Sequence, residues 1–194
     1  MRALVPRTVE LRSGPLTVLE AADPGLAFDV AIEAQAPPPY GAVLWATAVE
    51  LCRVLEGTQL RGKRVLELGS GCGLCSLVCA RAGASVLATD VDEDALIAVL
   101  RAAAAQALDV QTQLFDVTGA ETLPAHDVCV IADLLYEAPL ADAVARRVLE
   151  SHRLGARVIV GDPDRDGRKR FLQALVDAGH DVHFVGSVLV LEPA

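Results

Sequence analysis

From residue 64 onward, short apolar runs alternate with helical stretches, and this alternation constrains the fold more than any other feature of the sequence. Strands are predicted at residues 64–68, 85–89, 110–115, 128–132, 157–160, 180–185 and 188–191. Helices are predicted between them, at residues 74–81, 92–108, 140–152 and 168–178. Strands joined by helical crossovers pair in parallel through right-handed connections. The sequence therefore predicts a doubly wound α/β fold with three layers and a mostly parallel, seven-stranded sheet.

The last two predicted strands are separated only by Gly186 and Ser187, a two-residue loop that suits a type II′ hairpin. One strand near the edge of the sheet should therefore run antiparallel to its neighbour. A helix at residues 168–178 precedes this pair and ends at Gly179, a residue that often follows the last turn of a helix.

The N-terminal part of the chain follows a different pattern. Residues 8–20 alternate around Ser13-Gly14-Pro15 like a small hairpin, and residues 36–40 form a proline-rich, extended linker. We predict that residues 1–40 make up a hairpin and lid segment. Residues 41–194 are then expected to form a single-core binding domain that opens with an amphipathic helix over residues 41–56.

Length and charge exclude several classes of protein. The chain has 194 residues, enough for one substantial core, and no apolar run approaches the ~20 residues of a membrane-spanning helix. The net charge of −9, from 17 basic and 26 acidic residues, disfavours a nucleic-acid partner, whose phosphates attract basic surfaces. The N-terminus has no apolar block of signal-peptide length, so we expect a cytoplasmic location.

A glycine-rich segment, Glu67-Leu-Gly69-Ser-Gly71-Cys-Gly73, lies between the first predicted strand of the sheet and its helix. Open α/β sheets bind ligands at this position, beyond the carboxyl ends of the strands. Glycine lets the backbone approach a ligand closely, and the following helix N-terminus favours hydrogen-bond acceptors. The spacing differs from the G-x-G-x-x-G of dinucleotide folds, because Leu74 stands where the third glycine would be, and no Gly-Lys-Ser/Thr follows for a Walker loop.

An acidic residue, one further residue and then G-x-G-x-G resembles the first motif of the seven-stranded, S-adenosylmethionine-dependent methyltransferases, which have a Rossmann-like fold. The resemblance implies that S-adenosylmethionine is the cofactor and that Glu67 lies near its methionine end. It also implies that the backbone of Gly69, Gly71 and Gly73 passes beside the cofactor.

Two further acids end strands of the predicted sheet. Asp90 ends the second strand, where a carboxylate can accept both ribose hydroxyls of an adenosine. Asp116 ends the third, at the position that contacts the adenine amino group in the family that the chain resembles. Each aspartate alone also fits a turn or a helix cap, and NAD-dependent enzymes place an acid similarly.

The fourth predicted strand ends at Ala132 and is followed by Asp133 and Tyr136 in a D-x-x-Y pattern. This pattern resembles the protein-lysine methyltransferase branch, which includes electron-transfer-flavoprotein lysine methyltransferases and proteins described as nicotinamide N-methyltransferases. Trp45, in a G-x-x-x-W segment, and the segment Gly161-Asp-Pro-Asp-Arg165 support the same resemblance. It implies that Trp45 and Ala132 contact the cofactor. The N-P-P-Y/F tetrapeptide of exocyclic-amine DNA methyltransferases is absent.

Asp133 and Tyr136 are the candidate catalytic residues. A lysine ε-amine, with an ordinary pKa of ~10.4, must lose a proton before it attacks a methyl group, and a carboxylate, a phenol or desolvation assists this. We expect a protein lysine as acceptor, with a small, nicotinamide-like amine as the alternative. An NAD-dependent oxidoreductase and a catalytically silent adenosine-binding protein remain as alternatives outside this class.

Cysteines and histidines offer one competing interpretation. Cys72 and Cys75 form a C-x-x-C pair, which in a βαβ unit can be a redox site. The glycine segment occupies the same residues, and small thiols are common in protein cores. The four histidines are scattered, so no metal site is expected.

Overall fold

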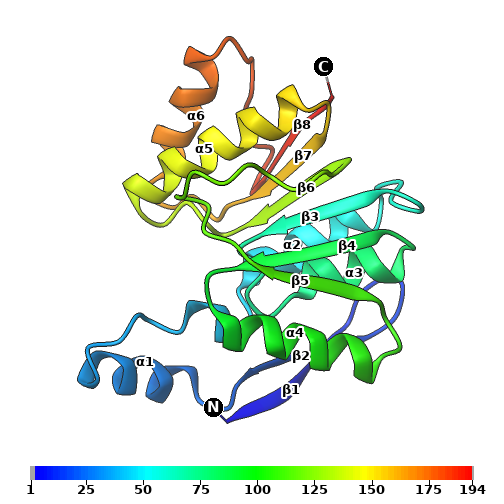
Figure 1. Cartoon of the computed structure of the whole chain (residues 1–194), viewed down its shortest axis with the longest axis vertical. Helices are drawn as coiled ribbons and strands as arrows, with labels where there is room; N and C mark the ends of the chain where they lie inside the picture. The colour runs from blue at the N-terminus through cyan, green and yellow to red at the C-terminus, as the bar shows by residue number, and fades with distance from the viewer. Residues whose placement is uncertain (1–2, 194) are drawn as a thin grey trace.

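A computed structural model describes residues 3–193 (Figure 1). The strands are β1 (Leu4–Val9), β2 (Leu16–Ala21), β3 (Arg64–Leu68), β4 (Ser85–Asp90), β5 (Val110–Leu114), β6 (Val128–Ala132), β7 (Arg157–Gly161) and β8 (Val188–Leu191). The helices are α1 (Pro24–Glu33), the short 3₁₀ turn η1 (Tyr40–Ala42), α2 (Ala46–Leu55), α3 (Leu74–Arg81), α4 (Glu93–Ala105), α5 (Ala138–Arg153) and α6 (Arg168–Asp177). Within this part of the chain, no helix is both long and apolar enough to cross a membrane.

The main sheet has the strand order β5-β4-β3-β6-β7-β8. Strands β3 to β7 run parallel, and β8 pairs antiparallel with β7. The predicted mostly parallel α/β sheet with one antiparallel strand is therefore confirmed. The strand order reverses its direction between β3 and β6, and such a reversal opens a crevice at the carboxyl ends of the two strands.

The predicted number of seven strands is wrong, because residues 180–185 do not form a strand and the main sheet has six. This segment contributes only an isolated antiparallel bridge between Val185 and Val188, across the predicted Gly186-Ser187 turn. Its alternating apolar side chains instead pack on α6. The Phe184 ring lies 6.2 Å from that of Phe171, and the Arg168 guanidinium lies 3.8 Å from the Phe184 ring centre. Here the period-two pattern reflects side-chain packing without strand pairing.

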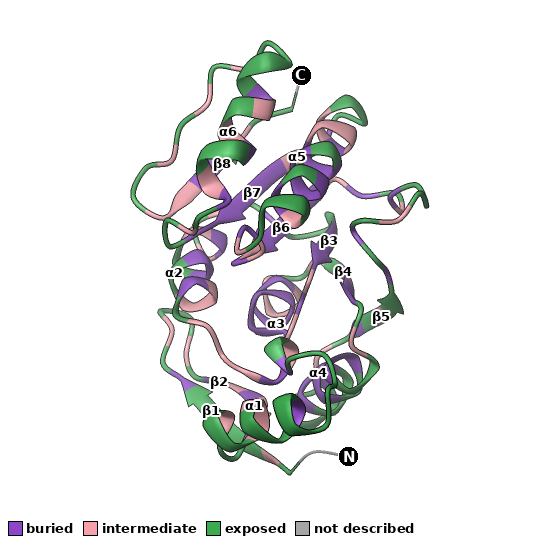
Figure 2. Cartoon of the chain, turned by 90° about the vertical axis from the view of Figure 1, so that its left-hand side faces the viewer, coloured by how far each residue is buried: buried purple, intermediate pink, exposed green. Residues whose placement is uncertain are grey.

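The sheet separates two apolar cores, which gives the expected three layers. On one face, α2, α3 and α4 share a core with Val65, Val128 and Val130; on the other, α5 and α6 share a second core with residues such as Leu66 and Ile131. Successive side chains of β3 therefore point to opposite faces, as the pleat requires. Figure 2 shows that α3 is buried along most of its length, which explains why its sequence is apolar all round.

The N-terminal segment forms more than a hairpin and a linker. Strands β1 and β2 form a separate antiparallel ribbon, and β2 packs against α3 and α4. The unpredicted helix α1 follows, with Asp23 as its cap accepting the Leu26 N–H at 3.0 Å, and it projects from the lower edge of the molecule (Figure 1). Only Ala31 of α1 is buried. The helix therefore has no wide buried face, and its sequence lacks the helical apolar periodicity that such a face would produce.

The first helix of the binding domain begins later than predicted. The chain makes the η1 turn and then extends through Val43 and Trp45 before α2 starts at Ala46. Trp45 is therefore the N-cap residue of α2 and not part of a helix over residues 41–56. The extended stretch carries the Trp45 side chain toward the carboxyl ends of β6 and β7.

Candidate functional site

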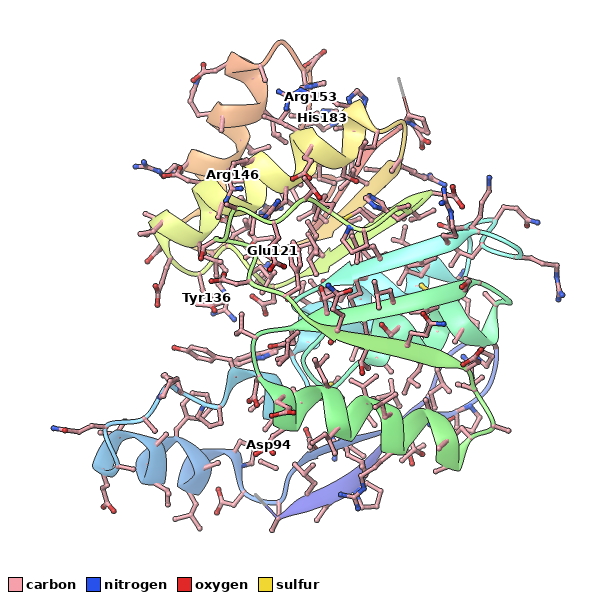
Figure 3. The ribbon with its side chains drawn as sticks, in the orientation of Figure 1. Asp94, Glu121, Tyr136, Arg146, Arg153 and His183 are labelled. Atoms are coloured by element: carbon pink, nitrogen blue, oxygen red, sulfur yellow. The ribbon has the colours of Figure 1, made fainter. Side chains whose placement is uncertain are left out.

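A cavity of about 810 Å³ opens at the carboxyl ends of the strands. It is lined by the linker over residues 36–45, the glycine loop after β3, the ends of β4 to β6 and Arg165 from the loop after β7. All the predicted site residues except Gly73 line it. Figure 3 shows Tyr136 between β6 and α5, on the side of the molecule where the N-terminal segment lies. The cavity is therefore closed partly by residues that precede the sheet.

The glycine loop needs glycine for two physical reasons. Gly69, Gly71 and Gly73 have positive φ values of 65°, 50° and 77°, a region that side chains with a Cβ atom rarely adopt. In addition, a Cβ atom on Gly69 would lie 2.7 Å from Leu134, and one on Gly73 would lie 2.5 Å from Val99. Gly73 is the N-cap residue of α3 and does not line the cavity, whereas Gly69 and Gly71 do.

Glu67 lies beneath this loop with only 2% of its surface exposed. Its carboxylate accepts a hydrogen bond from the Ser76 hydroxyl of α3. Burial raises the pKa of Glu67 to about 7, because the charged form loses its hydration. A cation brought beside Glu67 would favour its ionised form, so this carboxyl group can hold a ligand ammonium group.

Asp90 and Asp116 each hold a backbone turn and also line the cavity. Asp90 accepts the N–H groups of Gly71 at 2.8 Å and Asp92 at 3.0 Å, and burial raises its pKa. Asp116 accepts the hydroxyl and the N–H of Thr118, and these bonds lower its pKa. The turn interpretation and the ligand interpretation of these aspartates are thus compatible.

Asp133 occupies an unusual position at the end of β6. Its backbone has a φ of 59°, and its side chain is 4% exposed. The Arg165 guanidinium donates to both carboxylate oxygens, at 2.7 and 3.1 Å, and the Thr47 hydroxyl donates to one of them at 3.2 Å. The acid is therefore a fixed, ion-paired carboxylate. The sequence pointed to Asp133, but neither Thr47 nor the pairing with Arg165 was predicted.

Aromatic rings enclose the space beside Asp133. The ring of Tyr40 lies 5.1 Å from that of Tyr136, 6.3 Å from Trp45 and 5.5 Å from Phe28 of α1. Trp45 also donates its indole N–H to the Tyr40 carbonyl at 3.1 Å. Tyr136 is half-buried, and burial raises its pKa. Tyr40 and Phe28 were not predicted; the proline run before Tyr40 is the one sequence signal that fixes its extended approach.

The structure gives no support to the competing redox interpretation of Cys72 and Cys75. All five thiols are buried and free. Cys72 belongs to the glycine loop, whereas Cys75 belongs to α3 and lies 4.0 Å, sulfur to sulfur, from Cys52 of α2. Burial raises the pKa of Cys72 to about 12, and a thiol of this kind reacts slowly. Among residues 3–193, no group of three or more histidine, cysteine or acidic side chains is arranged for a metal ion.

The sheet and the glycine loop after β3 have the arrangement of the Rossmann-like methyltransferase fold. The sequence profile of the family described as lysine methyltransferase matches residues 28–177, so the chain belongs to that family. The electron transfer flavoprotein beta subunit lysine methyltransferase of Xenopus laevis is 38% identical over 136 residues, covering 66% of this chain and 53% of that protein. The chain thus spans about half the length of this curated relative.

Two other comparisons bear on the fold and on the alternatives. The 16S rRNA N2 G1207 methyltransferase of T. thermophilus, solved with AdoMet and guanosine, superposes with a TM-score of 0.70 at 18% identity, covering 100% of this chain and 52% of that one. At that identity the likeness concerns the fold alone. A 2-keto-3-deoxy-L-fuconate dehydrogenase of Xanthomonas campestris is 46% identical over 71 residues, but these are only 35% of this chain and 22% of that protein.

Proposed function

We propose that this protein is an S-adenosylmethionine-dependent methyltransferase that acts on a lysine ε-amine of a protein. Membership of the lysine methyltransferase family supports the reaction class. The observation that carries the proposal is that one cavity contains both the positive-φ glycine loop and the Asp133–Tyr136 pair. A cytoplasmic location stays the prediction made from the sequence.

The glycine side of the cavity fits the cofactor. S-adenosylmethionine, when bound, supplies a methyl group on a positively charged sulfur. We assign its ammonium group to Glu67, its ribose to Asp90 and its adenine to Asp116, with Gly69 and Gly71 contributing backbone along it. Gly73 supports the loop through α3, and Trp45 and Ala132 complete the wall. The buried Ser70 hydroxyl, which finds no partner among the described residues, also lines this side.

The aromatic side of the cavity fits the acceptor amine. Methyl transfer needs the amine lone pair to be aligned with the methyl group, so placement is the main task of the protein. The Asp133 carboxylate can accept a hydrogen bond from the amine and orient it. The rings of Tyr40, Trp45 and Tyr136 exclude water, which favours the neutral amine over the ammonium form. Tyr136 offers its hydroxyl as a second polar group at the rim.

Two experiments test the proposal. Calorimetric titration with S-adenosylmethionine, its demethylated product and NAD identifies the ligand; NAD binding without S-adenosylmethionine binding would reject the assignment. Labelled S-adenosylmethionine is then incubated with the protein fraction and, separately, with the small-molecule fraction of a host lysate. The beta subunit of electron transfer flavoprotein is included, because the relative in Xenopus laevis is named for it. Label confined to small molecules would overturn the protein-lysine assignment in favour of a nicotinamide-like amine.

A substitution of Asp133 tests whether this residue takes part in the reaction. Asp133→Asn retains the shape of the side chain and removes its charge. We expect S-adenosylmethionine affinity to be unchanged and turnover to fall, because the substitution affects only the acceptor side.

A further inference from the structure

Arg165 contacts the candidate acceptor site from the loop after a different strand. Asp133 follows β6, whereas Arg165 lies in the loop after the neighbouring strand β7. The guanidinium makes two hydrogen bonds to the carboxylate, at 2.7 and 3.1 Å. Such a two-point contact fixes the plane of the carboxylate as well as its distance, which a single contact does not. The pair therefore determines the direction in which the Asp133 oxygens point.

The backbone of Asp133 needs this support. A φ of 59° is unfavourable for a residue with a Cβ atom and persists only where the surroundings impose it. The Asp133 N–H donates to the Gly161 carbonyl at 2.8 Å, and the Thr47 hydroxyl donates to the side chain from α2. With Arg165, these contacts hold the acid from β7, from α2 and from the loop after β7.

Arg165 is itself held in place. Its guanidinium carbon lies 5.5 Å from the centre of the Trp45 ring, within the range of a cation–π contact. Its backbone N–H donates to the Asp162 carboxylate at 3.1 Å, and the Asp162 side chain is fully buried. Arg165 thus connects the wall of the cavity at Trp45 with the acid at the end of β6, and both lie beside the aromatic rings.

We propose that Arg165 is a positioning residue, which acts on the reaction by aligning the Asp133 carboxylate that receives the acceptor amine. The inference rests on the proposed function. It also assigns Asp133 a specific part: the carboxylate, held by the guanidinium at both oxygens, orients the amine through a hydrogen bond. The amine attacks in its neutral form, after its ammonium proton has left to solvent.

The test compares three arginine variants. Arg165→Gln removes the charge, and Arg165→Lys keeps a charge without the planar two-point fork. Arg170→Gln is the matched control, because Arg170 forms an exposed Arg–Asp pair with Asp142 between α5 and α6, outside the cavity. Initial rates are measured with labelled S-adenosylmethionine and the protein fraction of a host lysate, over a dilution series. Calorimetry gives the affinity for S-adenosylmethionine, and thermal melting confirms that each variant is folded.

We expect Arg165→Gln to lower the maximal rate by roughly 10- to 100-fold, the range for a misplaced reacting group. Affinity for S-adenosylmethionine should change less than about 3-fold, Arg165→Lys should recover part of the rate, and Arg170→Gln should resemble the wild type. Asp133→Asn supplies the decisive comparison. If Arg165 acts through Asp133, adding Arg165→Gln to Asp133→Asn causes little further loss.

The outcomes separate this inference from the proposed function. A wild-type protein that labels no protein rejects the function and the inference together. An active wild type with an Arg165→Gln rate equal to that of Arg170→Gln rejects the inference alone. Independent, multiplying losses in the double variant would also reject it, because Arg165 would then act by another route.

Discussion

The Asp90 carboxylate accepts the Gly71 backbone N–H at 2.8 Å, so the acid that ends β4 holds the middle of the glycine loop that follows β3. Its other oxygen accepts the Asp92 N–H at the start of α4. One side chain therefore connects two adjacent strand ends and a helix around the cavity. A ligand that binds Asp90 therefore contacts a carboxylate that the glycine loop already holds in place.

Replacing Asp90 tests this connection. Asp90→Ala should weaken S-adenosylmethionine binding by about 1–3 kcal/mol, because it removes the acceptor proposed for the ribose and frees the Gly71 N–H. Calorimetry measures the loss. Asp90→Asn, which keeps one carbonyl oxygen for Gly71, should lose less. Unchanged affinity in a folded Asp90→Ala protein would contradict the assignment.

The raised pKa of Glu67 predicts a pH-dependent affinity. In the ligand-free protein this pKa is about 7, so the carboxyl group is mainly neutral below pH 7 and mainly charged above it. A ligand ammonium binds the charged form, and S-adenosylmethionine affinity should therefore fall as the pH is lowered from 8 to 6. Glu67→Gln should bind more weakly at pH 8 and show a flatter profile. Titrations across this range check the prediction; a profile of wild-type shape in Glu67→Gln would assign the dependence to another group.

How much of the site is visible in the sequence depends on the range of the interactions. The strand β3, the loop from Gly69 to Gly73 and the helix α3 follow from local rules, because alternation, positive φ and capping each involve neighbouring residues. Helix α3 indeed spans the predicted Leu74–Arg81. The Asp133–Arg165 pair is different. It joins residues 32 positions apart, and only the parallel pairing of β6 with β7 brings them together.

Two errors have the same physical origin. Residues 180–185 alternate like a strand, but Phe184 finds its partners on α6 and the backbone stays largely outside the sheet. Helix α1 shows no clear apolar stripe. It packs against β2, and its Phe28 ring contacts the Tyr40 ring of η1. In both cases the tertiary neighbours, which the local pattern does not contain, decide the outcome.

Gly73 should be far less tolerant of substitution than a glycine of similar φ elsewhere. Gly73→Ala adds the strain of a positive φ and a Cβ atom 2.5 Å from Val99, so it should destabilise the protein by at least about 2 kcal/mol. Gly155 has a φ of 79° with nothing within 4 Å of its Cβ position, so Gly155→Ala is the control for strain alone. Chemical denaturation measures both. Equal losses would show that contact with Val99 contributes nothing, and Val99→Ala should rescue part of the Gly73→Ala loss.

Arg147 should contribute more to stability than its neighbour Arg146, although both bind the loop that follows Asp116. Arg147 is 1% exposed, donates to the carbonyls of Val117, Gly119 and Glu121 at 2.7–3.0 Å and pairs with Glu150 at 2.7 Å.

Arg147→Met removes the four hydrogen bonds of a buried guanidinium, to Val117, Gly119, Glu121 and Glu150, so we expect a loss of about 2–4 kcal/mol. Arg146 donates to some of the same carbonyls from an exposed position, and Arg146→Met should cost less than about 1 kcal/mol. Urea denaturation of both variants measures the difference. Because the loop directly follows Asp116, Arg147→Met should also weaken S-adenosylmethionine binding, and Arg146→Met should leave it close to the wild type. Equal destabilisation by the two substitutions would mean that the burial of Arg147 does not determine its contribution.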